Sequence, residues 1–323
     1  MSKPRIIVTR RWPQEVENIL AQKYDAVFNE HDVPLDSAAL VAAMRECDAL
    51  CPTVSDKLGT EILGASNRRA KVVANFGVGF NHIDLQAAKN NDVQVTNTPH
   101  VLTDCTADLA MTLMLMCARR AGEGERHVRD KAWTGWRPTH MMGTKITGKT
   151  LGLIGFGRIA QAMAKKAHFG FGMRIVFHDP FPPKDEVVKS LDARSCASVE
   201  AVLEQANFVS LHCPGGESTF HLINATRLAL MQSHAFLINT ARGDVVDQQA
   251  LLDALNNGQI AGAGLDVYEG EPAVPEEFLS LNNIVLLPHL GSATRETRIA
   301  MGMRVIDNLE AFFANKPLPD RVI

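Results

Sequence analysis

Residues 151–160 read LGLIGFGRIA, and this stretch decides the fold. Four apolar residues at 151–154 predict a buried strand, and the motif G-x-G-x-x-A follows from Gly155 to Ala160. The first glycine permits a tight turn, the second lets a phosphate approach the backbone, and the final alanine allows a helix to pack closely on the strand. The helix that follows offers free N–H groups at its N-terminus, which favours an anion there.

An acidic residue follows one strand later. The strand expected at 174–178 ends at Asp179, about 20 positions beyond Gly157, where dinucleotide-binding sequences carry a carboxylate. Such a carboxylate accepts hydrogen bonds from the ribose hydroxyls and repels a 2′-phosphate. Pro180 comes next, so no arginine stands there to hold an extra phosphate. The sequence therefore predicts NAD as the cofactor, in preference to NADP.

Short β-rich runs alternate with helical stretches along most of the chain. Strands are expected at 5–9, 48–51, 71–74, 93–96, 208–211, 235–238, 261–267 and 284–287. Helices are expected at 37–46, 84–90, 103–120, 159–167, 247–256 and 294–314, and residues 122–148 are expected to be irregular. Because strands separated by helices pair in parallel, the predicted fold is α/β, with two Rossmann-like or flavodoxin-like parallel-sheet domains and a cleft between them.

Composition excludes several classes of protein. The 323 residues are enough for about two domains, and 46% hydrophobic with 21% charged residues is ordinary for a globular protein. A net charge of -3 argues against nucleic-acid binding and against a protein held on an anionic membrane. No signal peptide or membrane span is expected, and the six cysteines form no C-x-x-C pair. Reduced thiols and a cytoplasmic location are therefore expected.

Three polar side chains fall in successive strand-end loops, namely Arg242, Glu271 and His289. Ligands of open α/β sheets bind beyond the carboxyl ends of the strands. Arginine binds a carboxylate through two parallel hydrogen bonds. Histidine titrates near neutral pH and suits proton transfer to a carbonyl oxygen, and a neighbouring glutamate favours the imidazolium and orients the ring. With a dinucleotide loop nearby, the three residues predict reduction of a 2-keto acid, or oxidation of the 2-hydroxy acid in reverse.

Six segments match one family: 106–110, 148–159, 212–214, 239–243, 264–272 and 288–294. Together they resemble the D-isomer-specific 2-hydroxyacid dehydrogenases, over essentially the whole chain. The resemblance implies Arg242 as the substrate anchor, His289 as the acid/base and Glu271 as its partner. Segment 168–173 looks like that of bacterial glyoxylate/hydroxypyruvate and 2-ketogluconate reductases. Those relatives usually prefer NADPH and carry Asn-Arg where this chain has Asp179 and Pro180.

The resemblance also implies a domain organisation. Residues 1–99, completed by 290–323, would bind the substrate, and residues 100–289 would form an NAD-binding Rossmann domain with dimerisation elements at 103–120 and 122–148. A homodimer is implied. The backbone N–H groups of Val78 and Gly79 would bind the substrate together with Arg242 and His289. Implied cofactor contacts, besides Gly155, Gly157 and Asp179, are Thr106, Arg158, Ile159, His212, Cys213, Pro214, Thr219, Thr240, Ala241, Asp266 (at the nicotinamide carboxamide) and Gly291.

The leading hypothesis is an NAD-dependent D-2-hydroxyacid dehydrogenase for a substrate such as glyoxylate, hydroxypyruvate or glycerate. The alternative is a non-catalytic NAD sensor similar to the C-terminal-binding co-repressors, which retain the same three polar residues. An exposed peptide cleft and a long disordered tail would favour the sensor, and the sequence ends at Ile323, soon after the final helix. The histidines show no metal-ligand spacing, so no metal is predicted.

Overall fold

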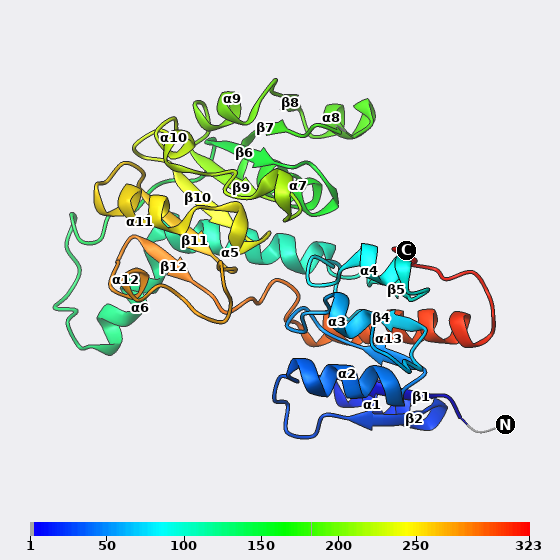
Figure 1. Cartoon of the computed structure of the whole chain (residues 1–323). Helices are drawn as coiled ribbons and strands as arrows, with labels where there is room; N and C mark the ends of the chain where they lie inside the picture. Colours follow the sequence, from blue (N-terminus) through cyan, green and yellow to red (C-terminus); the bar gives the residue numbers. More distant parts are fainter. Residues whose placement is uncertain (1–2, 182) are drawn as a thin grey trace. The chain divides into compact units, whose positions relative to one another are not determined.

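The computed structural model describes residues 3–181 and 183–323 (Figure 1). The chain divides into two compact units, which are described separately. The first contains the residues up to Leu102 together with Ser292–Ile323, and the second contains Thr103–Gly291. Each unit is built on one parallel sheet, which confirms the predicted fold class of two parallel-sheet α/β domains.

The first unit holds a five-stranded sheet in the order β2-β1-β3-β4-β5. Its central strands are short, apolar and buried, as expected where helices cover both faces of a parallel sheet. The strands are β1 (Arg5–Val8), β2 (Asp25–Phe28), β3 (Ala49–Cys51), β4 (Val72–Ala74) and β5 (Gln94–Thr96). The helices are α1 (Gln14–Lys23), α2 (Ser37–Glu46), α3 (Thr60–Leu63), α4 (Leu85–Asn90) and α13 (Arg295–Phe313).

The second unit holds a seven-stranded sheet in the order β12-β11-β10-β9-β6-β7-β8, with every pair parallel. Its strands are β6 (Thr150–Ile154), β7 (Arg174–His178), β8 (Ala193–Ser195), β9 (Phe208–Leu211), β10 (Phe236–Asn239), β11 (Gly262–Leu265) and β12 (Ile284–Leu286). The first strand in sequence, β6, lies inside the sheet. Later strands extend the sheet on both sides of it, which is the order of dinucleotide-binding domains with one strand added.

Helices cover both faces of this second sheet (Figure 1). They are α5 (Thr103–Arg119), α6 (Ala121–Arg129), α7 (Arg158–Phe171), α8 (Asp185–Ser190), α9 (Val199–Leu203), α10 (Ala225–Leu228), α11 (Gln248–Asn256) and α12 (Glu276–Leu279). On one face α5 and α7 pack against each other and bury a cluster in which the rings of Phe156 and Phe177 stack at 4.0 Å. A second apolar cluster under α9, α10 and α11 covers the other face.

Two expectations about helices need correction. Residues 122–148 are not wholly irregular, because α6 occupies Ala121–Arg129. That helix buries no residue and is supported by ion pairs such as Arg120–Glu123 and Glu125–Arg129, so apolar periodicity could not reveal it. The helix expected to end at 167 continues to Phe171 and stops at Gly172, which has a positive φ of 59°.

The six cysteines are all free thiols. Within the part of the chain that the structure describes, no helix is both long enough and apolar enough to cross a membrane.

Candidate active site

The predicted polar residues of the second unit gather at the carboxyl edge of the seven-stranded sheet. Strands β6 and β9 are neighbours there, and the chain leaves them toward opposite sides of the sheet. Such a reversal opens a crevice in which α/β domains bind ligands. The glycine loop follows β6, and Arg242, Glu271 and His289 follow β10, β11 and β12.

The glycine loop leaves open space beside Gly157 but none beside Gly155. Gly155 has a φ of 82°, and a Cβ atom there would lie 2.8 Å from the Cys213 nitrogen, so only glycine fits. A Cβ atom at Gly157 would meet nothing within 4 Å. Gly157 precedes α7, and no side chain caps the helix at this end. The open space and the uncapped N–H groups suit a pyrophosphate.

Asp179 directly follows β7, and its carboxylate forms a hydrogen bond with the glycine loop. Its Oδ2 accepts a hydrogen bond from the Phe156 N–H at 2.6 Å, and its Oδ1 accepts one from the Phe181 N–H at 2.7 Å. Asp179 therefore fixes the middle of the loop from the neighbouring strand. The sequence predicts a carboxylate here, but no local pattern of residues indicates its contact with Phe156.

His289 and Glu271 form a hydrogen-bonded pair. The His289 Nδ1 lies 2.7 Å from the Glu271 Oε2, and the Glu271 Oε1 accepts the Tyr268 N–H at 3.0 Å. Burial raises the pKa of Glu271, but the hydrogen bond and charge of His289 outweigh it, so the pKa is lowered overall. An ionised Glu271 can only accept, so it takes a hydrogen bond from Nδ1–H, and Nε2 is the ring nitrogen left to contact other groups.

The backbone around His289 is held by Asp266, which is 1% exposed. His289 has a φ of 54°, and its N–H donates to the Asp266 carbonyl at 2.9 Å. The Asp266 carboxylate accepts N–H groups from Leu290 at 2.6 Å and from Gly291 at 2.8 Å. Burial raises the pKa of this carboxyl group. Thr106 completes the arrangement by donating its hydroxyl to the Gly291 carbonyl at 3.0 Å.

Arg242 is a half-buried cation without an ion-pair partner among the described residues. Its Nη1 donates to the Ala241 carbonyl at 2.6 Å. Burial lowers its pKa, while the charges of Glu271 and Asp244 act in the opposite direction. Arg242 follows β10 and Glu271 follows β11, and these strands are neighbours in the sheet, so the structure brings Arg242 to the same edge as the His289–Glu271 pair.

Two residues that support Arg242 were missed by sequence analysis. The Asn239 side chain donates to the Arg242 carbonyl at 2.8 Å and accepts the Ala241 N–H at 3.0 Å, which shapes the loop after β10. A Cβ atom at Gly243 would lie 1.9 Å from the Tyr268 carbonyl carbon, so the Arg242 loop and the Glu271 loop are in direct backbone contact. Asn239 and Gly243 belong to the matching segment 239–243, but only their contacts in the structure show that they shape the Arg242 loop.

The other predicted cofactor residues also lie along this edge. Thr219 donates its hydroxyl to the Pro214 carbonyl at 2.7 Å, and the Cys213 thiol has its pKa raised to about 11 by burial. Thr240 is 9% exposed, and its Oγ1 is buried without a partner in the described structure. Arg158 and Ile159 begin α7 at the glycine loop. The unpartnered Thr240 hydroxyl and the open space at Gly157 show that this edge fits a dinucleotide.

His212 predicts a measurable dependence of stability on pH. Its Nε2 lies 2.9 Å from the Ser210 Oγ, and desolvation lowers its pKa to about 4. As pH falls below the ordinary histidine pKa, His212 becomes protonated in the unfolded chain but stays neutral in the folded protein. Protonation therefore stabilises the unfolded chain, and the free energy of unfolding decreases. Between about pH 7.5 and about pH 5 the loss through this group is at most about 2 kcal/mol.

Urea denaturation at the two pH values tests this. The loss should be smaller in His212→Gln, whereas the control His31→Gln, at an exposed histidine, should behave as wild type. An equal loss in His212→Gln and wild type would contradict the assignment.

Val78 and Gly79 lie in the first unit, in the loop after β4. Their predicted contact with a substrate therefore stays a prediction.

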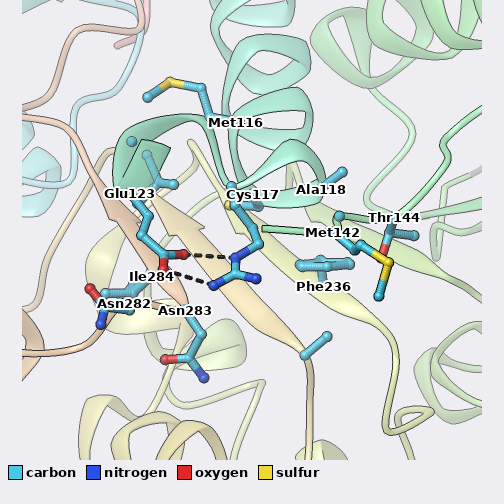
Figure 2. Close-up of a pocket in the computed structure, with 15 residues that line it drawn as sticks. Met116, Cys117, Ala118, Glu123, Met142, Thr144, Phe236, Asn282, Asn283 and Ile284 are labelled. Atoms are coloured by element: carbon cyan, nitrogen blue, oxygen red, sulfur yellow. Dashed lines mark hydrogen bonds and ion pairs between the residues drawn. The ribbon is translucent and has the colours of Figure 1, made fainter. Parts of the chain in front are cut away.

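A cavity of about 320 Å³ lies at the opposite, amino edge of the second sheet (Figure 2). Phe236 and Ile284, which begin β10 and β12, line it together with Met116 and Cys117 of α5. The Arg120–Glu123 ion pair also faces it. None of the three predicted catalytic residues lines this cavity, so it is separate from the candidate active site.

Comparison with known proteins agrees with this geometry. Residues 111–291 match the family model for the NAD-binding domain of D-isomer specific 2-hydroxyacid dehydrogenases. The chain is 42% identical to a glyoxylate reductase of Thermococcus litoralis, covering 99% of this chain and 97% of the relative. It is 40% identical to a glyoxylate reductase of Korarchaeum cryptofilum, covering 99% and 96%.

Among solved structures, it superposes with a TM-score of 0.88 on the NADPH-dependent glyoxylate/hydroxypyruvate reductase of Sinorhizobium meliloti in complex with NADP and malonate, at 36% identity over 99% of this chain and 97% of that one. The chain therefore belongs to the D-isomer specific 2-hydroxyacid dehydrogenase family.

Proposed function

We propose that this protein is an NAD-dependent enzyme that interconverts a small 2-keto acid and its 2-hydroxy acid, of D configuration where C2 is a stereocentre, with glyoxylate or hydroxypyruvate as the keto acid. The observation that carries the proposal is the His289–Glu271 pair, with Nδ1 and Oε2 2.7 Å apart. The pair lies at the same sheet edge as the glycine loop and as Arg242, which has no ion-pair partner among the described residues. The relatives named glyoxylate reductase support the choice of substrate.

Arg242 anchors the substrate in this proposal. The Arg242 guanidinium is half-buried and has no ion-pair partner in the described structure. A carboxylate that accepts two parallel hydrogen bonds from it would neutralise its charge and stabilise it. Lysine has no such planar pair of donors. Binding the carboxylate in this way fixes the direction of the adjoining keto group.

His289 exchanges the proton. Its Nδ1–H is held by Glu271, so Nε2 donates a proton to the carbonyl oxygen during reduction and takes it back during oxidation. The same hydrogen bond to Glu271 fixes the orientation of the imidazole ring. Hydrogen bonds from the loop 289–291 to Asp266 keep the ring from moving away.

The cofactor residues are proposed from the same geometry. The uncapped end of α7, beginning at Gly157, Arg158 and Ile159, would hold the pyrophosphate, and the Thr240 hydroxyl would gain a partner. When bound, the nicotinamide ring supplies or accepts the hydride. The remaining contacts proposed are Thr106, Gly155, Asp179, His212, Cys213, Pro214, Thr219, Ala241, Asp266 and Gly291.

Asp179 predicts a preference for NAD. Replacing it with asparagine removes the negative charge and keeps an oxygen that can accept the Phe156 N–H. Because charge repulsion against a 2′-phosphate is lost, the ratio of kcat/KM with NADPH to kcat/KM with NADH should rise about tenfold in Asp179→Asn. Initial rates with both cofactors measure this ratio, and an unchanged ratio would show that Asp179 does not select the cofactor.

A homodimer formed through the second unit is part of the proposal. Trp133, Trp136 and Met142 are 54%, 82% and 68% exposed, all within the segment that the resemblance assigns to dimerisation. Exposed large apolar side chains gathered in one segment are typical of an interaction surface. Sedimentation equilibrium tests the dimer, and a monomer at all concentrations would exclude it. The six free thiols suit a reducing, cytoplasmic location, which fractionation of the source cells would test.

Initial rates of NADH and NADPH oxidation with a panel of 2-keto acids test the function. The expected result is saturable turnover of glyoxylate or hydroxypyruvate, faster with NADH. NADH binding without turnover of any 2-keto acid would refute the enzyme and favour the co-repressor-like sensor.

A further inference from the structure

The loop after β4 has an unusual set of hydrogen bonds, all within the first unit. The Asn75 Nδ2 donates to the Gly77 carbonyl at 3.1 Å and to the Gly79 carbonyl at 2.9 Å. The Asn97 Nδ2 donates to the Val78 carbonyl at 2.8 Å. Three consecutive carbonyl groups are thus bound by two side-chain amides.

The two asparagines come from neighbouring strands. Ala74 of β4 pairs with Thr96 of β5, so Asn75 and Asn97 follow the strands at matching positions on the carboxyl edge of the sheet. Asn75 is fully buried, and its Oδ1 lies 3.0 Å from the His82 Nε2. Because its Nδ2 is committed to two carbonyls, its Oδ1 must accept, and His82 donates. The amide of Asn75 therefore has a fixed orientation.

Fixing the carbonyls also fixes the N–H groups. In a trans peptide the C=O and the following N–H point in opposite directions. With the carbonyls of Gly77, Val78 and Gly79 directed at the asparagines, the N–H groups of Val78, Gly79 and Phe80 are directed away from the sheet edge. Successive N–H groups that point in the same direction can bind an anion together.

We propose that Asn75 and Asn97 are positioning residues, which hold the N–H groups of Val78, Gly79 and Phe80 ready for the substrate carboxylate. The inference rests on the proposed function and on the predicted contact of the Val78 and Gly79 N–H groups with that carboxylate. A preformed set of donors lowers the cost of ordering the loop when the substrate binds. Neither asparagine touches the reacting atoms in this proposal, so both act through the loop.

Asparagine-to-aspartate variants test the proposal, because aspartate has the same shape but turns an oxygen toward the carbonyls. In Asn75→Asp the loop should lose its fixed orientation. We expect KM for glyoxylate and the inhibition constant of oxamate, a non-reducible analogue, to rise about 10–100-fold. The kcat should change much less, since binding to the amides is shared by ground state and transition state. The Kd of NADH, followed by fluorescence, should stay unchanged.

Asn91→Asp is the matched control. The Asn91 Nδ2 also donates to a backbone carbonyl in the first unit, that of Ala87 at 2.8 Å, but that carbonyl belongs to α4. This variant should keep the wild-type KM. If Asn75→Asp fails to fold, Asn97→Asp, which affects one hydrogen bond, decides the question, and Asn97→Gln, which keeps a donor, should recover part of the affinity.

The outcomes separate the two claims. Wild-type turnover of glyoxylate with an unchanged KM in folded Asn75→Asp and Asn97→Asp overturns the positioning role and leaves the proposed function intact. A lower kcat and a weaker affinity for NADH, together with a higher KM, would indicate general damage to the protein and would also overturn the positioning role. If the wild-type protein turns over no 2-keto acid, the proposed function fails and the positioning role fails with it.

Discussion

Replacing His289 with asparagine is expected to lower kcat for glyoxylate reduction by about 10²–10⁴-fold, the usual contribution of a general acid. Asparagine is the informative substitution because His289 has a φ of 54°, a conformation that asparagine tolerates better than alanine does. The variant should therefore keep its fold while losing the group that supplies the proton. The Kd of NADH should remain close to that of wild type.

The matched control is His221→Asn. His221 also has a positive φ, of 48°, and its Nε2 lies 3.2 Å from the Glu269 Oε2. It has the same residue type, backbone conformation and kind of partner as His289, but lies outside the proposed active site. His221→Asn should retain the wild-type kcat. Equal rates for His289→Asn and wild type would exclude His289 as the acid.

The second large effect is expected at Arg242. Changing it to glutamine removes the charge and the paired donors, and the loss of a buried, hydrogen-bonded charge pair typically costs roughly 2–5 kcal/mol. We expect kcat/KM for glyoxylate to fall about 10²–10³-fold. Arg242→Lys should recover only part of this loss, because lysine keeps the charge but not the parallel geometry. Steady-state kinetics of both variants measure the effect.

Arg227→Gln serves as the control for this pair of variants. The Arg227 guanidinium lies in the same unit and binds Glu200 at 2.7 Å, so it is already satisfied within the protein. Its replacement should leave kcat/KM near the wild-type value. If Arg242→Gln behaves like Arg227→Gln, the carboxylate of the substrate is bound elsewhere.

Sequence reasoning predicted most of the framework because the parallel strands are buried on both faces. Such strands form short, continuous apolar runs, and β6, β9 and β10 are fully buried where these runs occur. Several short elements were not predicted, among them the helix α1 and the strand β2. In β2 the side chains alternate between exposed and half-buried, and four residues give too little periodicity to distinguish a strand from a loop.

The candidate site was predictable only in part, for a different reason. Motif spacing indicated Gly155, Asp179 and His289, because each comes shortly after the end of a strand. The contacts that hold these residues come from hydrogen bonds between distant segments, such as Asp179 to Phe156 and Asp266 to Gly291. A local pattern of residue types contains no information on such pairs. The asparagines beneath the Val78 loop were missed for the same reason.

In the proposed reaction a hydride passes from a nicotinamide to the carbonyl carbon of a 2-keto acid while His289 supplies the proton. The most direct test uses NADH deuterated at its transferable position, with glyoxylate as substrate and mass spectrometry of the product. We expect one deuterium on the hydroxyl-bearing carbon of glycolate for each NADH oxidised, and far slower labelling with His289→Asn. NADH oxidation without label in glycolate, or no glycolate at all, would contradict it.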